Sequence, residues 1–183
     1  MTVADGAPAG ADDAPSYAAP DGLRVGHVHL RVSDLDRALR FWRDALGLRV
    51  TQRGPRVAFL SAGGYHHHVA LNTWESLGGP PPAPGTTGLY HVALLYPDRA
   101  SLGAALARAL GAGTPLDGAA DHGVSEAAYL RDPDGNGVEL YRDRPRADWP
   151  LLPDGSLAMG NARLDVAALL AEGRGAAGPH QPA

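Results

Sequence analysis

Apolar and polar positions follow the same succession of patterns twice between residues 22 and 145. The first copy opens on RVGHVHLRV, in which every second residue is apolar, as in a half-buried strand. SDLDRALRFWRDALG follows with apolar residues at helical spacing, Ser33 or Asp34 as the cap and Gly47 as the stop. LRVTQRG, RVAFLSAGG and HHHVALNTW then predict three short strands, separated by Gly and Pro. The first copy is therefore a predicted βαβββ unit.

The second copy begins after the Pro-rich connector GGPPPAPGTTG and repeats this order. LYHVALLY predicts a strand, DRASLGAALARALGAG a helix, and TPLDGAADHG, SEAAYLRD and GVELYRD three further strands. His91 stands 64 residues after His27, and Gly111 stands 64 residues after Gly47, which supports a repeat. We therefore expect an α+β fold of two βαβββ modules. The expected bounds are 22–77 for the first module and 87–145 for the second.

The remaining segments lie outside this repeat. Residues 146–172 form a predicted extension whose stretch LDVAALLAEG is a short helix packed on the outside. Residues 1–21 and 173–183 are rich in Ala, Gly and Pro, which predicts two disordered tails. The first tail has neither a basic start nor a continuous apolar run, so we expect no signal peptide and no membrane span in it.

Composition narrows the class of partner. The chain has 183 residues, 44% of them hydrophobic, with a net charge of −4 and a pI near 6.0. This charge gives no attraction to nucleic acid or to an anionic membrane, so we expect a small-molecule partner. The sequence contains no cysteine, which excludes disulfides and thiolate metal sites and fits a cytoplasmic protein. The oligomeric state is open, with a homodimer as one candidate.

Three side chains are candidates for a metal site. Alternation turns His27 away from the apolar face of its strand, His91 occupies the equivalent place in the second copy, and Glu139 faces the same way between Val138 and Leu140. Two histidines and one carboxylate with open positions suit non-haem Fe(II). A lone histidine on a strand is more often structural, but core packing gives no reason for the same polar residue at both repeated positions. The predicted helices should then cover the outer face of the sheets and leave the histidines inside.

A calcium loop is a competing interpretation of DPDGNG, residues 132–137. The spacing of Asp132, Asp134 and Asn136 matches the start of such a loop, and Asp143 stands at its twelfth position. Pro133 is awkward in that loop, and strand patterns flank it where helices are required. We therefore predict a tight β-turn.

Three stretches together resemble the vicinal oxygen chelate superfamily, and within it the short two-module extradiol catechol 2,3-dioxygenases. They are VGHVHLRVSDLDRALRFWRDALGL, GLYHVALL and YLRDPDGNGVELY, and the resemblance covers about residues 22–145. It implies paired βαβββ modules curved around a metal. His27, His91 and Glu139 match the family's iron ligands, so Fe(II) is the expected cofactor, although the sequence does not distinguish it from Mn(II).

The resemblance also implies residues that act on the substrate. Extradiol dioxygenases have an acid–base histidine before a Val-Ala pair, which matches His67, whereas strict alternation turns His68 toward the cavity. Both stay candidates; we prefer His67, since a bulge would reconcile the two arguments. His122 matches a histidine that contacts substrate or oxygen, and Tyr129 matches a tyrosine bonded to a substrate oxygen. Without the resemblance, these two are as readily a turn residue and a core aromatic.

The function expected from the resemblance is Fe(II)-dependent extradiol cleavage of a catechol-type aromatic diol by dioxygen, as in aromatic catabolism. Two other functions occur on the same fold. One is that of a glyoxalase-like metal-dependent isomerase or lyase, and the other is that of a metal-free protein that binds an aromatic drug. Glyoxalase-like members usually carry a metal-binding carboxylate on the last strand of the first module, where this sequence has HHHVALN. The substituents on the catechol are not predictable from the sequence.

Overall fold

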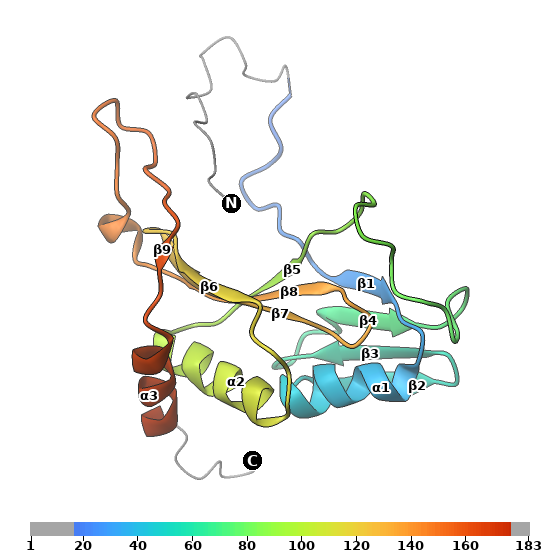
Figure 1. The fold of residues 1–183 in the computed structure, drawn as a ribbon. Helices are drawn as coiled ribbons and strands as arrows, with labels where there is room; N and C mark the ends of the chain where they lie inside the picture. Colours follow the sequence, from blue (N-terminus) through green and yellow to red (C-terminus); the bar gives the residue numbers. More distant parts are fainter. Residues whose placement is uncertain (1–16, 177–183) are drawn as a thin grey trace.

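Two βαβββ units build the protein, which is described by a computed structural model over residues 17–176 (Figure 1). In the first unit the strands have the order β1-β4-β3-β2, with β1 parallel to β4 and the other neighbours antiparallel. Helix α1 continues directly into the π-helical segment η2. The elements are β1 (Val28–Arg31), α1 (Leu35–Leu39), η2 (Arg40–Ala45), β2 (Arg49–Gly54), β3 (Val57–Ser61) and β4 (Val69–Asn72).

The second unit repeats this topology. Its sheet has the order β5-β8-β7-β6, with β5 parallel to β8, and the short strand β9 extends it beyond β6. The elements are β5 (Val92–Leu95), α2 (Arg99–Gly111), β6 (Gly118–Asp121), β7 (Ser125–Arg131), β8 (Gly137–Asp143) and β9 (Ala162–Arg163). The predicted α+β fold of two βαβββ modules is confirmed.

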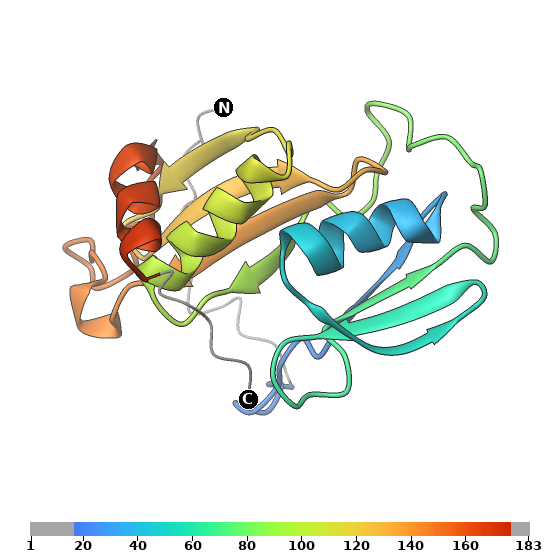
Figure 2. The same cartoon turned by 90° about the horizontal axis from the view of Figure 1, so that it is seen from below.

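The helices cover one face of both sheets, as Figures 1 and 2 show. Each main helix begins where the sequence places a cap: Asp34 accepts a hydrogen bond from the Arg37 N–H, and Asp98 accepts one from the Ser101 N–H. Their apolar sides join the sheets in one core cluster that spans the two units. The other face of the sheets is therefore free of helices.

Several strands are shorter than predicted, and this fixes the position of the histidines. The predicted strands around His27 and His91 begin only at Val28 and Val92, so each histidine directly precedes the first strand of its unit. The strand predicted from His66 begins at Val69, after bends at residues 65, 66 and 68. Strict alternation consequently does not apply to the histidine run.

The extension after β8 contains a 3-10 turn η3 (Arg146–Asp148), β9 and helix α3 (Val166–Ala176). Helix α3 lies against α2, and a Cβ added at Gly103 would lie 2.2 Å from the Leu169 carbonyl oxygen. The predicted disordered tail was wrong over residues 173–176, which are helical because α3 continues to pack on α2 through Gly173. Residues 1–16 and 177–183 of the two predicted tails lie outside the described residues.

The DPDGNG segment is the turn of the β7–β8 hairpin, as predicted. Asp132 Oδ1 accepts hydrogen bonds from the backbone N–H groups of Asp134 and Asn136, so its carboxylate closes the turn. Gly135 has a φ of 85°, which favours glycine. Within residues 17–176, no helix combines the length and apolarity that crossing a membrane requires.

Candidate active site

His91 and Glu139 lie together where β5 meets β8. Glu139 pairs with Ala93 of the parallel strand β5, and His91 precedes that strand by one residue. The His91 Nε2 and Glu139 Oε2 atoms are 2.9 Å apart, and Glu139 is 8% exposed. A Cβ at Gly137 would lie 2.1 Å from the Tyr90 carbonyl oxygen, so only glycine lets the two strands approach this closely.

The 2.9 Å contact between Nε2 and Oε2 is an ordinary hydrogen-bonded pair of an imidazole and a carboxylate. Both groups are also of the types that ligate a divalent metal. Nε2 is the ring nitrogen of His91 that faces the carboxylate. The buried Nδ1 has no hydrogen-bond partner among the described residues.

Tyr129 stands beside Glu139 because the two residues are register partners in the antiparallel β7–β8 pair. The Tyr129 hydroxyl lies 3.3 Å from Glu139 Oε1 and 2.8 Å from His122 Nε2. Burial, followed by the charge of Glu139, raises the pKa of Tyr129 to about 12. The phenol therefore stays protonated at neutral pH and acts as a hydrogen-bond donor.

His122 lies at the end of β6 and completes this row. Its Nδ1 is 2.8 Å from the Gly160 carbonyl oxygen, which can only accept a hydrogen bond. Nδ1 therefore carries a proton, and in the neutral ring Nε2 accepts the hydrogen of the Tyr129 hydroxyl. The hydroxyl has a single hydrogen, so at any moment it donates either to His122 Nε2 or to Glu139 Oε1. His91, Glu139, Tyr129 and His122 thus form one row of polar contacts.

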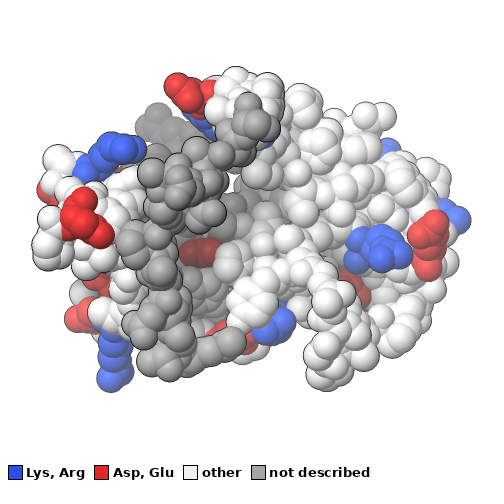
Figure 3. All heavy atoms as spheres, turned by 90° about the horizontal axis from the view of Figure 1, so that it is seen from above, with Lys and Arg blue, Asp and Glu red and all other residues white. Residues whose placement is uncertain are grey.

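A cavity of about 620 Å³ opens onto this row. His91, His122 and Tyr129 line it, as does Asn161 from the extension. Figure 3 views the molecule from the side opposite the helices, where uncharged residues make up much of the visible surface. Leu130 and Val138 give the cavity an apolar part, which suits an aromatic ligand.

His27 lies in the other unit, against the histidine run. Its ring centroid is 4.3 Å from that of His67, and His27 itself is exposed. The structure does not bring His27 to His91 and Glu139, and within residues 17–176 no three metal-ligating side chains are grouped. Of the three predicted ligands, the structure brings together His91 and Glu139. The His27 ring packs instead on His67 of its own unit.

The bend before β4 separates the two acid–base candidates. His67 packs between His27 and Phe59, with its ring centroid 5.0 Å from that of Phe59. His68 is turned to its own hairpin, where Nδ1 lies 2.9 Å from Ser61 Oγ and accepts the Ala62 N–H. His67 is therefore the one of the two that contacts a predicted metal ligand.

The environment of His67 keeps it neutral. Partial burial lowers its pKa below the ordinary value of 6.5, and the neighbouring histidines, His27 and His66 first among them, lower the pKa further. A histidine that is neutral near pH 7 can accept a proton.

Residues 24–140 match the sequence model of the glyoxalase/bleomycin resistance protein/dioxygenase superfamily. The chain belongs to this superfamily. It is 41% identical over 152 residues to a catechol-2,3-dioxygenase of Bacillus subtilis, covering 83% of this chain and 53% of the relative. It is 34% identical over 120 residues to biphenyl-2,3-diol 1,2-dioxygenase 3 of Rhodococcus globerulus, covering 66% of this chain and 63% of that protein.

The chain thus spans between half and two thirds of the length of these two relatives. A solved glyoxalase/dioxygenase structure from Nostoc punctiforme has the same fold, with a TM-score of 0.56 and 22% identity. The similarity covers 72% of this chain and 99% of that one. The resemblance noted in the sequence is confirmed at the level of the superfamily.

Asn161 is the pocket residue that the sequence did not indicate. The superfamily match ends at residue 140, and Asn161 reaches the pocket only because β9 pairs with β6. A strand of two residues has no readable alternation. The Asp117–Arg131 ion pair, with 2.8 Å between Oδ2 and Nε, also lines the pocket and was likewise not predicted.

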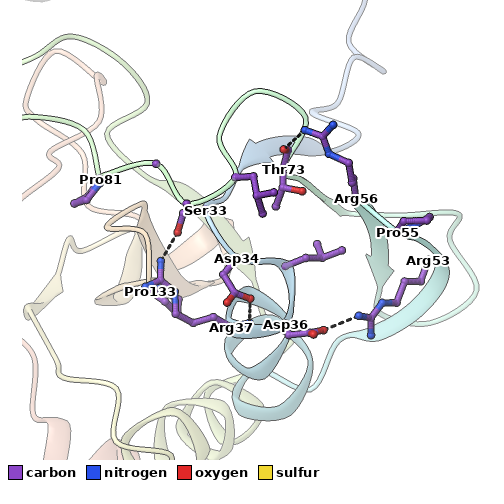
Figure 4. Close-up of a pocket in the computed structure, with 14 residues that line it drawn as sticks. Ser33, Asp34, Asp36, Arg37, Arg53, Pro55, Arg56, Thr73, Pro81 and Pro133 are labelled. Carbon is purple, nitrogen blue, oxygen red and sulfur yellow. Dashed lines mark hydrogen bonds and ion pairs between the residues drawn. The ribbon is translucent and has the colours of Figure 1, made fainter.

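A second cavity, of about 830 Å³, lies at the start of α1 and contains none of the predicted site residues (Figure 4). Three arginines line it, and each is already engaged. Arg53 pairs with Asp36, Arg56 donates to the Thr73 carbonyl, and Arg37 binds Asp134 in the β7–β8 turn. This part of the superfamily fold joins the two units and offers no free cation to a ligand.

Proposed function

We propose that this chain is an Fe(II)-dependent extradiol dioxygenase that opens the ring of a catechol-type aromatic diol. The main support is the row of His91, Glu139, Tyr129 and His122, of which His91, Tyr129 and His122 line one cavity. It combines two metal-ligating groups with two groups that hydrogen-bond to oxygen. The two similar proteins compared above are named as dioxygenases of catechol and of a biphenyl diol.

His91 and Glu139 hold the iron, with His27 as the third ligand from the other unit. When bound, Fe(II) lowers the pKa of coordinated hydroxyl groups and supplies electrons for oxygen chemistry. His91 and Glu139 already lie 2.9 Å apart, whereas the His27 side chain would have to turn from His67 toward them to complete the site.

Tyr129 and His122 orient the substrate. The high pKa of the Tyr129 phenol, about 12, keeps the hydroxyl protonated. Its one hydrogen turns from His122 or Glu139 toward a substrate oxygen, and the contact with His122 holds the hydroxyl beside the cavity. Donors that are already positioned toward developing negative charge stabilise the transition state.

His67 takes the phenolic proton of the bound diol. Its lowered pKa favours the neutral ring, which can accept a proton, and its ring contacts that of His27, the proposed third ligand. His68 is held by Ser61 and shapes the wall of its hairpin.

The test is ring cleavage by the iron-loaded chain. Protein loaded anaerobically with Fe(II) is mixed with catechol and then with ¹⁸O₂. We expect a yellow semialdehyde that carries two ¹⁸O atoms, and the same preparation of Glu139→Gln should form none. An isomerase, a lyase or a drug-binding protein incorporates no oxygen from O₂. Absence of product across simple and substituted catechols, with Fe(II) or Mn(II), would overturn the proposal.

A further inference from the structure

The segment after η3 is tied to the site at both of its ends. Trp149 Nε1 donates a hydrogen bond to the Arg144 carbonyl at the end of β8. At the other end, β9 pairs with β6 through Asp121 and Ala162, and α3 packs on α2. The intervening loop projects away from the second sheet (Figure 1), and its two ends are held against that sheet.

His122 and Gly160 are joined by two hydrogen bonds in this arrangement. The Gly160 N–H donates to the His122 carbonyl at 3.0 Å, and His122 Nδ1–H donates to the Gly160 carbonyl at 2.8 Å. Gly123 fits closely under the same loop: it has a φ of 78°, and an added Cβ would lie 2.9 Å from Pro150 Cγ. The extension thus holds both the backbone and the ring of His122.

Asn161 follows Gly160 and directly precedes β9, which pairs with β6. Because Asp121 pairs with Ala162, the antiparallel ladder places Asn161 opposite His122, and Asn161 lines the cavity with it. The amide of Asn161 makes no side-chain hydrogen bond to any residue in the described range 17–176. An amide that has both donors and an acceptor, and that lines a pocket unengaged, suits a polar group of a ligand.

We propose that Gly160 and Asn161 of the extension complete the catalytic pocket. The Gly160 carbonyl fixes the tautomer and orientation of His122, and the Asn161 amide binds a polar, uncharged substituent on the aromatic diol. The substrate part of this inference rests on the proposed function, and the tautomer part does not. Both residues lie beyond residue 140, where the match to the superfamily model ends.

The tautomer is tested by ring ¹⁵N chemical shifts of the full, metal-free chain, with the His122 signals assigned from their loss in His122→Asn. The unmodified protein should show a protonated Nδ1 and an unprotonated Nε2. Gly160→Pro removes the N–H that binds the His122 carbonyl and should shift the ring toward a mixture of tautomers. Gly160→Ala retains this N–H, and an added Cβ there meets nothing within 4 Å, so it should keep the Nδ1–H form.

A protonated Nε2 with a bare Nδ1 in the unmodified protein would overturn the positioning role, even if Gly160→Pro fails to fold. Ring shifts that are identical in Gly160→Pro and in the unmodified protein would do the same.

The Asn161 role is tested with two probes that differ by one hydroxyl, 4-methylcatechol and 4-(hydroxymethyl)catechol. The iron-loaded chain should prefer the second, and Asn161→Ala should reduce the ratio of the two kcat/KM values by about tenfold, because one hydrogen bond is lost. Arg163→Ala, on the same strand but outside the cavity lining, should leave that ratio as it is.

A ratio near one in the unmodified protein, or an unchanged ratio in Asn161→Ala, would overturn the Asn161 role. If neither probe nor any other catechol is cleaved, the proposed function fails and takes the substrate part with it. The ¹⁵N measurement still decides the tautomer part.

Discussion

Asp134 Oδ1 lies 2.6 Å from the guanidinium of Arg37, although 97 residues separate the two in sequence. The same oxygen accepts hydrogen bonds from the backbone N–H and the hydroxyl of Ser33. Asp134 belongs to the β7–β8 turn of the second unit. Ser33 and Arg37 lie at the start of α1 in the first unit (Figure 4). One carboxylate therefore joins the two halves of the repeat.

Asp134→Ala should destabilise the protein by about 2 kcal/mol. The carboxylate is 7% exposed, and its loss leaves three donors at Ser33 and Arg37 without their acceptor. Arg37 is 43% exposed and so regains water, which keeps the loss below that of a fully buried pair. The measurement is the free energy of unfolding in urea.

Arg53→Ala is the matched control. It breaks the Arg53–Asp36 pair, whose side chains are 47% and 69% exposed, and should cost less than about 1 kcal/mol. If both variants lose the same free energy of unfolding, the interactions of Asp134 contribute no more than an exposed ion pair.

The fold was predictable because each unit repeats one order of patterns and its helices begin at Asp34 and Asp98 with clear caps. The exact ends of the strands were not predictable from the sequence. Bends such as those at His66 and His68 are set by side-chain contacts, among them the hydrogen bond between His68 and Ser61. The two-residue strand β9 pairs through backbone groups of the extension and carries no apolar pattern.

Alternation and the repeat predicted His91 and Glu139, whereas Tyr129 and His122 were predicted from the resemblance to the superfamily alone. The Gly160 carbonyl that holds His122 was not, since a backbone acceptor has no signature in sequence. His27 stays a predicted ligand. His27 and His91 take equivalent positions, each directly before the first strand of its unit. The structure does not bring their side chains together.

Gly103→Ala should lower the free energy of unfolding by about 2 kcal/mol or more, although alanine favours helices. The added Cβ would lie 2.2 Å from the Leu169 carbonyl oxygen, so α2 and α3 must separate. Gly175→Ala, in α3, meets nothing within 4 Å and should stabilise by up to about 1 kcal/mol. Thermal unfolding of both variants measures the two changes in stability, which are expected to have opposite signs.

His91→Ala and Glu139→Ala should each weaken Fe(II) binding by more than the ~10- to 100-fold that loss of an outer-shell partner costs, because each removes a direct ligand. Metal analysis of anaerobically loaded protein measures this. His29→Ala is the control, as His29 bonds to Asn72 on the first unit.

The same analysis decides the third ligand. His27→Ala is expected to lose the metal as the other two variants do. Stoichiometric iron in His27→Ala alone would mean that the third ligand lies elsewhere, whereas stoichiometric iron in all three single variants would remove the metal site altogether.

Stability at mildly acidic pH should depend on His67. Its pKa in the folded protein is below 6.5, so the unfolded chain binds the proton more tightly. The free energy of unfolding contributed by this group is unaffected above about pH 7 and falls as the pH drops through 6.5 toward the folded pKa. His67→Gln should flatten this acid-side fall in metal-free protein, with identical pH dependence above pH 7 as the internal control. A slope unchanged by the substitution would contradict the lowered pKa.

The histidine run yields the last prediction. If His67 is the acid–base residue, His67→Ala should retain iron and bind catechol anaerobically but cleave it about 10²- to 10⁴-fold more slowly on addition of oxygen. His68→Ala should be milder and act mainly on substrate affinity, because its ring is engaged with Ser61 and Ala62 rather than directed to His27. The reverse ranking would assign proton transfer to His68. The packing of His67 on His27 would then be only structural, and His68 would have to leave Ser61 when substrate binds, a movement visible as a substrate-dependent shift of its ring ¹⁵N signals.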